Sequence, residues 1–276
     1  MDKPSLNEDK FVWKKNDQVE YFKSPAWEAY SFVAHAFCTR RGGVSSGRFA
    51  ALNMSGREGE EDANVSANWD IAAAAFGLTR RHFFRIHQVH GDKILVIDSA
   101  DFLIHTCRPL EYDAVVTNRP GLALCILTAD CVPVLVADPA RRIVAAVHAG
   151  WRGTALNISG QVVTLLRERF GSSTRDIRAA VGPAIGPCCY EVYDAVRAAM
   201  DRHPGRDAIF TKQKEPGKWR LDLALANRLQ IEAAGVTGGN IQVANLCTSC
   251  RRDLFYSHRG EGGKTGRLLN FIMISP

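Results

Sequence analysis

The chain has 276 residues, which allows one large domain or two small ones at about 150 residues per domain. Its 46% hydrophobic and 23% charged residues are typical of a folded globular protein and exclude a disordered, collagen-like or fibrous chain. A net charge of +6 suits an anionic small ligand and does not by itself indicate nucleic acid. The eight cysteines and eight histidines limit the metal and redox chemistry that the chain can carry.

The first ten residues lack the apolar segment of a signal peptide, and no later run reaches the roughly 18 apolar residues of a membrane span. We therefore expect a cytoplasmic protein that contacts no membrane. Cysteines stay mostly reduced in that compartment, so the eight cysteines are interpreted as packing residues, metal ligands or nucleophiles rather than as a disulfide framework.

Apolar periodicity and turn residues predict elements along most of the chain. In chain order we expect a helix over 65–76, strands over 83–86, 94–97, 114–117, 122–127, 132–137 and 143–148, a helix over 156–170, a strand over 177–181, helices over 191–200 and 223–234, and a strand over 241–244. The middle strands are joined by turns too short for helical crossovers, so we expect them to pair antiparallel.

No repeat and no convincing linker divides the chain, and residues 204–218 are interpreted as a polar excursion. The predicted fold class is α+β: a single domain of mixed, largely antiparallel sheets packed with flanking helices in an α/β/β/α arrangement. Residues 30–276 are predicted to form this catalytic domain, with residues 1–29 as an N-terminal extension packed on it.

One predicted hairpin carries candidate chemistry. Asp138 and Pro139 begin a favourable four-residue turn, and a two-residue loop would place Cys131 directly opposite His148, with Cβ atoms about 4.5 to 5.5 Å apart. The two side chains could then share one metal ion or one proton. A slip of one residue would put them on opposite faces, and Pro133 indicates an edge strand or a local irregularity. The alternative is a buried cysteine beside a hydrogen-bonded core histidine.

Three further positions near predicted strand ends are candidates. His90 lies in a polar, histidine-rich link after the strand at 83–86, although His-x-x-His spacing alone is weak evidence for a site. Asp130 precedes the hairpin cysteine and is a candidate general acid or base, or a turn former. Arg152 begins a predicted helix, where backbone amides and the guanidinium can stabilise an anion.

Six sequence blocks resemble a known family, in matching order from about residue 30 to the C-terminus. They are Thr39-Arg40-Arg41-Gly42-Gly43-Val44-Ser45, Gln88-Val89-His90-Gly91, Thr128-Ala129-Asp130-Cys131, His148-Ala149-Gly150-Trp151-Arg152-Gly153, Gly182-Pro183-Ala184-Ile185-Gly186-Pro187, and Cys247-Thr248 with Thr265-Gly266-Arg267. The chain resembles the YfiH-like family, whose members are labelled multicopper polyphenol oxidases or laccase-domain proteins.

The resemblance implies a zinc or copper site formed by His90, Cys131 and His148. It also implies purine nucleoside phosphorylase activity on adenosine, inosine and S-methyl-5′-thioadenosine, together with adenosine deamination. The expected partners are these nucleosides and phosphate, with no nucleic acid and with a monomer or homodimer as the assembly.

The histidine count argues against a multicopper oxidase, a class that needs many histidines in His-x-His pairs. This chain has eight histidines and no such pair. A His₂Cys set with an open fourth position is typical of catalytic zinc, although copper remains possible. Zinc activates water and polarises oxygens, which suits deamination of an adenine at C6.

Phosphate binding is assigned to Arg40, because a guanidinium beside the turn amides of Gly42 and Gly43 suits a dianion, with a solvated arginine as the alternative. Asn53, Gln88 and Arg152 complete the predicted substrate-binding and phosphate-binding set. The Cys247 and Cys250 pair is half of a zinc site, and the sequence offers no second half, so this pair and Cys188-Cys189 are interpreted as structural.

Different mechanisms remain open from the sequence. Cys131 as nucleophile and His148 as base would make a cysteine hydrolase or amidase, for example on peptidoglycan precursors. In that enzyme His90 has no role, whereas the metal site needs it as a third ligand. Copper-dependent polyphenol oxidation and a non-enzymatic metal or nucleotide sensor are two further hypotheses.

Overall fold

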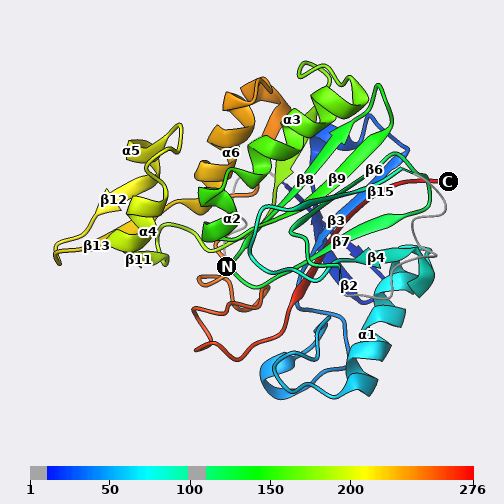
Figure 1. The fold of residues 1–276 in the computed structure, drawn as a ribbon. Helices are drawn as coiled ribbons and strands as arrows, with labels where there is room; N and C mark the ends of the chain where they lie inside the picture. Colours follow the sequence, from blue (N-terminus) through cyan, green and yellow to red (C-terminus); the bar gives the residue numbers. More distant parts are fainter. Residues whose placement is uncertain (1–10, 99–109) are drawn as a thin grey trace.

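Two six-stranded sheets form the centre of the molecule, and helices cover their outer faces (Figure 1). The computed structural model describes residues 11–98 and 110–276. The first sheet has the order β1 (Val12–Asn16), β2 (Val19–Lys23), β3 (Val33–Cys38), β15 (Leu268–Ile274), β7 (Ala123–Thr128) and β4 (Phe83–Arg85). The second has the order β14 (Ile241–Val243), β10 (Arg178–Val181), β8 (Val132–Asp138), β9 (Ile143–Ala149), β6 (Ala114–Thr117) and β5 (Ile94–Ile97).

A third, three-stranded sheet projects to one side of the molecule (Figure 1). It contains β11 (Glu191–Tyr193), β13 (Lys218–Leu221) and β12 (Phe210–Lys212). The α-helices are α1 (Asp62–Ala75), α2 (Trp151–Ala155), α3 (Ile158–Phe170), α4 (Asp194–Ala199), α5 (Arg206–Ile209) and α6 (Leu223–Ala233). Short 3₁₀ helices are η1 (Pro25–Trp27), η2 (Gly47–Phe49), η3 (Arg80–His82) and η5 (Gly238–Asn240).

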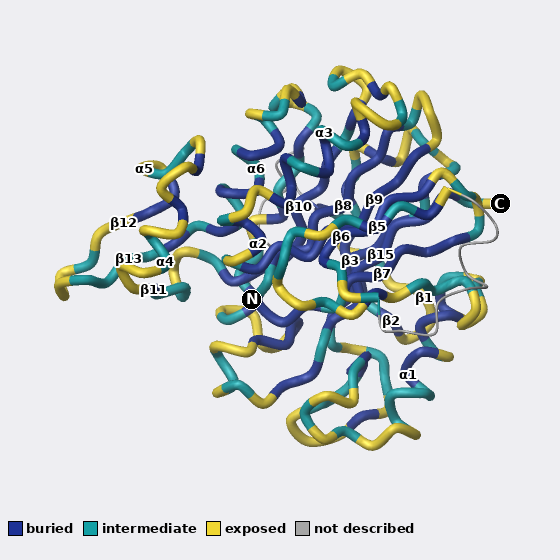
Figure 2. Tube along the Cα trace, viewed as in Figure 1, coloured by how far each residue is buried: buried dark blue, intermediate teal, exposed yellow. Residues whose placement is uncertain are grey.

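The layers follow from apolar strands whose two faces are both covered. All seven residues of β8 and all seven of β9 are buried, and Figure 2 shows these strands deep in the molecule. Successive side chains of a strand point to opposite faces, so Val134 packs in the cluster beneath α3 and α6, while Leu135 packs against the first sheet. α1 covers the outer face of the first sheet. The predicted α+β class and its α/β/β/α layering are confirmed.

Most predicted elements are present, with two local corrections. The helix predicted over 156–170 begins two residues later, as α3 at Ile158, because Asn157 adopts a left-handed conformation with φ +63° that separates it from the short helix α2. The helix predicted over 191–200 begins as strand β11 and is helical only from Asp194. The polar excursion over 204–218 contains α5 and β12 of the projecting sheet.

The hairpin of β8 and β9 has a different register from the predicted one. Asp138 pairs with Ile143 and Pro133 pairs with His148, so the loop holds the four residues 139–142 rather than two. Arg142, with φ +53°, closes that longer loop. The register differs from the prediction by two residues, which preserves the face of every side chain, so Cys131 and His148 remain on the same side as diagonal neighbours.

The prediction that the middle strands pair with one another is wrong for β7, which lies in the first sheet while its sequence neighbours β6 and β8 lie in the second. β7 and β8 follow one another closely in sequence but belong to different sheets. The chain turns the corner between the sheets at Asp130, whose φ is +83°. β8 is also an interior strand between β10 and β9, and the carbonyl of Pro133 accepts a hydrogen bond from the amide of Gly182 at 2.9 Å. Cys131, the hairpin cysteine of the candidate site, directly follows this corner.

Candidate metal centre

Three side chains from separate segments converge beside this corner. A nitrogen of His90, the Sγ of Cys131 and a nitrogen of His148 all lie within 4.8 Å of one another. His90 comes from the loop after β4, Cys131 immediately precedes β8, and His148 is the sixth residue of β9. His148 is buried, Cys131 is half-buried and His90 is exposed. The donors therefore face a common point that solvent reaches from the His90 side.

Asp113 holds this centre together, although the sequence patterns did not single it out. One carboxylate oxygen accepts from His148 Nδ1 at 2.8 Å and from the His90 amide at 2.9 Å. The other oxygen accepts from the Gly91 amide at 2.6 Å. Because Nδ1 of His148 donates to Asp113, its Nε2 is left to bind a metal, as in other carboxylate–histidine–metal arrangements. The residue immediately precedes a predicted strand, and that position is the only signal the sequence carries.

The same contacts shift the pKa of the buried Asp113. Burial alone would raise the pKa of this carboxyl, but hydrogen bonds from His148 and from the amides of Gly91 and His90 lower it below its ordinary value overall. Asp113 is therefore a carboxylate that accepts hydrogen bonds from both histidine-bearing segments.

The electrostatics favour a thiolate at Cys131. Although burial opposes the charge, the neighbouring His148 and hydrogen bonds from both histidines lower the pKa of the Cys131 thiol to about 6. Burial likewise opposes charge on His148, but Cys131 and Asp113 raise its pKa to about 9. In the absence of metal the pair is a thiolate beside an imidazolium, and a thiolate is the form of cysteine that binds metals or attacks as a nucleophile.

Gly150 allows the two ligand-bearing loops to meet. A Cβ atom at this position would lie 2.9 Å from Cδ2 of His90 and 3.2 Å from Sγ of Cys131. The first distance is shorter than carbon atoms tolerate, so any other residue would displace the His90 ring or the Gly150 backbone. The glycine of the His148-Ala149-Gly150-Trp151 block therefore serves close packing against the ligands.

The three ligands open into a cavity of about 310 Å³. Four arginines line it, namely Arg57, Arg152, Arg259 and Arg267, together with the aromatic rings of Trp151 and Tyr190. A second cavity of about 820 Å³ adjoins it and shares Arg57, Gln88, Leu127 and Arg267 with it, but this larger cavity does not contain the three ligands. The smaller cavity therefore combines an anion-attracting wall with aromatic surfaces next to the candidate metal ligands.

The four arginines differ in their partners, and Nη2 of Arg57 lies 3.3 Å from Nδ1 of His87. Arg267 pairs with Glu58 at 3.1 Å, and Arg259 donates to the carbonyl of Glu191 at 2.9 Å. Among residues 11–98 and 110–276, no carboxylate forms an ion pair with Arg57 or with Arg152, whose guanidinium lies 4.5 Å from the centre of the Trp151 ring.

The structure separates the predicted substrate-binding residues into two groups. Arg152 and Gln88 line the cavity, whereas Arg40 and Asn53 line neither cavity. The guanidinium of Arg40 donates to the carbonyls of Ala50, Arg252 and Arg48 and pairs with Glu261 at 2.9 Å. Arg40 therefore joins chain segments instead of presenting a fork to solvent.

The amides of Asn53 and Gln88 are likewise engaged by the backbone. Asn53 is fully buried, and its side chain bonds the backbone of Ser55 and the amide of Arg267. Gln88 donates to the Leu127 carbonyl and accepts from the Leu127 amide, both at 2.8 Å, which fixes the His90 loop against β7. Asn53 and Gln88 therefore hold the backbone of neighbouring segments in place.

Asp130 lines the cavity, and both of its carboxylate oxygens already accept hydrogen bonds. Thr248 Oγ1 donates to one oxygen at 2.6 Å and the Arg259 amide donates to the other at 2.6 Å. The carboxylate thus ties the corner between the sheets to residues 248–259, which carry part of the cavity wall.

Sequence reasoning missed several lining residues. Tyr190 and Arg57 have no motif of their own, and only their place beside matching blocks could have suggested them. Burial raises the pKa of Tyr190 to about 12, with a further contribution from Cys131, so its phenol is a hydrogen-bond donor at the cavity wall.

Several known proteins are similar to this chain in sequence. A family model described as multi-copper polyphenol oxidoreductase laccase matches residues 34–275. A protein named purine nucleoside phosphorylase from Bacteroides thetaiotaomicron is 37% identical over 252 residues, covering 89% of this chain and 93% of that protein. Purine nucleoside phosphorylase YlmD from Geobacillus stearothermophilus is 39% identical over 240 residues, covering 85% of this chain and 87% of that protein.

Solved structures show the same fold. The crystal structure of YlmD from Geobacillus stearothermophilus matches with a TM-score of 0.87 and 34% identity, over 96% of this chain and 100% of that chain. The crystal structure of a Bacillus licheniformis hypothetical protein, YfiH, matches with a TM-score of 0.88 and 36% identity, over 96% and 99% of the two chains. The chain therefore belongs to the laccase-domain family, also called the YfiH family, whose model is described as multi-copper polyphenol oxidoreductase laccase.

Proposed function

We propose that this protein is a purine nucleoside phosphorylase with a single-metal centre at His90, Cys131 and His148. Its substrates are adenosine, inosine and S-methyl-5′-thioadenosine with phosphate, and adenosine deamination is a second activity. The observation that carries the proposal is the convergence of a His₂Cys donor set on a cavity lined by arginines and aromatic rings. Relatives that match most of the chain are named purine nucleoside phosphorylases, which supports the same reaction.

The donor set fits zinc. Two imidazoles and one thiolate would leave one of the usual four coordination positions of zinc open, as is typical of catalytic zinc, and Asp113 orients one of the imidazoles. Zinc bound there would supply a Lewis acid at the cavity wall. Cu²⁺ is the alternative metal for these ligands.

The described part of the chain does not bring together the ligands that a multicopper centre needs. Within the described part of the chain, the one group of three or more potential ligands that contains histidine is His90 with Cys131 and His148. A blue-copper site would also need an axial methionine; among the described residues no methionine lines this cavity, whereas Met54 lines the neighbouring one. We therefore favour phosphorolysis over copper-dependent polyphenol oxidation.

Arg152 and Arg57 are the proposed phosphate-binding residues. Both line the cavity, and a guanidinium presents two parallel N–H donors to an oxyanion. Trp151 holds the Arg152 guanidinium against its ring, which restricts the orientation of that donor. Arg40 was the phosphate ligand expected from the sequence, and its engaged donors lead us to replace it in this role.

Trp151 and Tyr190 are the proposed contacts for the purine. Their rings line the same cavity as the metal ligands, and aromatic faces bind bases by stacking. The Tyr190 phenol stays protonated and can donate a hydrogen bond to a ring nitrogen.

We propose that Asp130 positions the cavity wall. Its two oxygens accept from Thr248 and Arg259, so the carboxylate holds the segment that presents the Arg259 and His258 side chains to the cavity. A direct proton transfer by Asp130 would require one of these bonds to break. The protein is further proposed to act in the cytoplasm as a monomer or homodimer.

A cysteine hydrolase or amidase is the second candidate, favoured by one observation. Cys131, His148 and Asp113 form a chain in which the carboxylate orients the histidine and the histidine lowers the pKa of the thiol. This is the arrangement of a nucleophile, a base and an orienting group. The hydrolase does not use His90, whereas the metal centre does.

The experiment incubates purified protein with adenosine and phosphate, before and after removal of metal with a chelator and after return of Zn²⁺. The proposal predicts adenine with ribose 1-phosphate, and inosine from the second activity, with loss of turnover on chelation. If these products are absent while an amide or ester substrate acylates Cys131, the protein is a hydrolase instead.

A further inference from the structure

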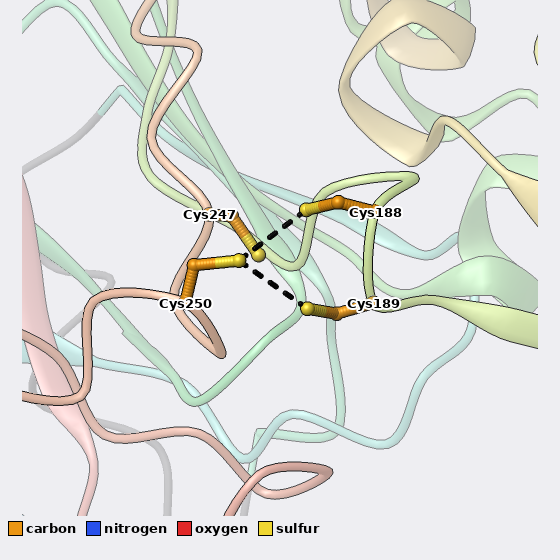
Figure 3. A group of neighbouring side chains, drawn as sticks. All are labelled: Cys188, Cys189, Cys247 and Cys250. Atoms are coloured by element: carbon orange, nitrogen blue, oxygen red, sulfur yellow. Dashed lines mark hydrogen bonds between the residues drawn. The ribbon is translucent and has the colours of Figure 1, made fainter.

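Four cysteines form a second cluster outside the His90 centre. Cys188, Cys189, Cys247 and Cys250 place their Sγ atoms within 4.8 Å of one another. Figure 3 shows the first two pointing from one loop towards the other two on a second loop. Two segments that are far apart in sequence, with 61 positions between Cys189 and Cys250, thus supply two halves of one group. The adjacent pair is the half that the sequence analysis did not find.

Backbone turns bring each pair to the same side. The amides of Cys189 and Tyr190 both donate to the carbonyl of Gly186 at 3.0 Å, so the chain curls and adjacent cysteines do not diverge as they would in a strand. The Arg251 amide donates to the carbonyl of Cys247 at 3.0 Å and closes a matching turn around the second pair.

The two loops are also held in register with each other. Ala184 and Cys247 form a parallel bridge, in which the Thr248 amide donates to the Ala184 carbonyl at 3.0 Å. Gly186 lies directly beneath the sulfurs, since a Cβ atom there would be 3.2 Å from Cβ of Cys247 and 3.3 Å from Sγ of Cys188. The cluster is therefore built by main-chain geometry on both sides.

Packing in a hydrophobic core does not explain why cysteines occupy these four positions. Unreactive cysteines are usually buried, yet Cys188 and Cys250 are exposed and the other two are half-buried. The contacts between the sulfurs are two weak ones, from Cys250 to Cys188 at 3.5 Å and to Cys189 at 3.4 Å. Four thiols grouped at the surface indicate a shared ligand.

We propose that Cys188, Cys189, Cys247 and Cys250 bind one Zn²⁺ ion as a structural site. Zn–S bonds of about 2.3 Å in a tetrahedron set the sulfurs about 3.8 Å apart, which agrees with a cluster confined to 4.8 Å. The Gly186 amide donates to Sγ of Cys247 at 3.2 Å, a contact that stabilises thiolate charge. Four protein ligands close the coordination sphere, so the ion is structural rather than catalytic.

The ion clamps two walls of the 310 Å³ cavity together. One cysteine pair immediately precedes Tyr190, which lines the cavity. The other pair flanks Thr248, whose hydroxyl donates to Asp130, and precedes Arg259, whose amide donates to the same carboxylate. Zinc at the four sulfurs fixes these segments relative to each other, whichever reaction the cavity catalyses.

The test measures zinc per chain after Zn²⁺ loading and gel filtration. We use a His90→Ala background, which removes a ligand of the other centre, and compare it with the same protein carrying Cys188→Ser and Cys250→Ser. The matched control is Cys125→Ser in that background, because Cys125 is a thiol outside the cluster and serine keeps its donor to the Ala123 carbonyl. The proposal predicts one tightly held zinc in the background protein and in the control, and its loss in the double variant.

A second measurement uses protein in which all four cysteines are intact, so its result does not depend on whether the double variant folds. Co²⁺ added to the metal-free His90→Ala protein is expected to give the absorption bands of a tetrahedral tetrathiolate site, and Zn²⁺ is expected to protect four thiols from alkylation until a chelator is added. The proposal is overturned if the reduced protein retains no zinc and shows no such bands. It is equally overturned if the cysteines are isolated as disulfides that full reduction does not convert into a zinc-binding form, or if iron is bound in place of zinc.

Discussion

Close packing and one carboxylate determine the candidate metal centre at the level of single residues. His90 and Asp130 both have positive φ, at +62° and +83°, a conformation that disfavours residues other than glycine. Hydrogen bonds hold both: the His90 amide donates to Asp113, and the Asp130 carboxylate accepts from Thr248 and Arg259. The site therefore depends on hydrogen bonds to residues other than His90, Cys131 and His148.

Gly150→Ala tests the close approach of the ligand loops. The added methyl would contact the His90 ring at 2.9 Å, so we expect zinc binding at the His90 centre to weaken by about tenfold or more. Competition with a chromophoric chelator measures this affinity. Gly239→Ala is the control, because a Cβ there meets nothing within 4 Å. Equal zinc affinity in the two variants would show that the His90 ring is free to move aside.

Asp113→Asn tests the orientation of His148. The amide keeps the size of the carboxylate but loses the charge that holds the Nδ1 proton, so zinc affinity is expected to fall by about 10- to 100-fold. Asp98→Asn serves as the control, since that carboxylate pairs with Arg169 at the surface. The role assigned to Asp113 is wrong if both variants retain wild-type metal affinity and turnover.

At the level of elements, the sequence predicts the strands better than their partners. Alternating and continuous apolar runs identify β4 to β10, because burial of side chains determines both the pattern and the strand. The register of the β8–β9 hairpin depends on loop length, which residue types specify weakly, and the longer loop displaced it by two residues. Cys131 and His148 still lie on the same face of the sheet, because a displacement of two residues does not change the face to which a side chain points.

Several parts of the site had no local signal. β7 and β8 enter different sheets through a corner at Asp130, and a short turn gives the same sequence pattern for a corner as for a hairpin. Asp113 and the Cys188-Cys189 half of the cysteine cluster act through contacts with residues far away in the chain. Such contacts follow from the tertiary fold and not from motif spacing.

The central strand β15 joins the first sheet to α1. Phe271 is 1% exposed and packs edge-on against Phe76 at 4.8 Å and Phe83 at 5.7 Å between ring centres. Phe271→Ala leaves a cavity between these elements, so the free energy of unfolding is expected to fall by about 3 to 5 kcal/mol. Urea unfolding measures it, with the exposed Val44→Ala as a control that changes little. A loss below about 1 kcal/mol would mean that α1 does not rely on this contact.

At the scale of the whole molecule, two packed sheets bury polar groups as well as apolar ones. His35 of β3 is 3% exposed, and its Nε2 accepts a hydrogen bond from the Ser24 amide at 2.9 Å. Burial, aided by the charge of Lys23, lowers the pKa of His35 to about 3, so this histidine is neutral in the fold.

Within the described residues, no helix is long and apolar enough to cross a membrane.

The neutral His35 predicts how stability depends on pH. The unfolded chain takes up a proton at this residue below about pH 6.5, while the folded chain resists protonation down to about pH 3. Stability from this residue is therefore present above pH 6.5 and is lost as the pH falls, by up to about 1.4 kcal/mol per pH unit. Urea unfolding from about pH 7 to about pH 4 should show a shallower decline in His35→Gln, which does not titrate. Parallel declines in the two proteins would rule out this role for His35.

The most direct test of the central claim is a product balance on adenosine, measured for the zinc-loaded wild type and for His90→Ala. Phosphorolysis at the His90, Cys131 and His148 centre predicts ribose 1-phosphate in an amount equal to adenine plus hypoxanthine, because inosine formed by deamination is itself phosphorolysed. None of these three products is expected without phosphate, and all of them are expected to be lost together with the centre's zinc in His90→Ala. Unchanged adenosine with the folded, zinc-loaded wild type would contradict the account. So would His90→Ala turning over as fast as the wild type.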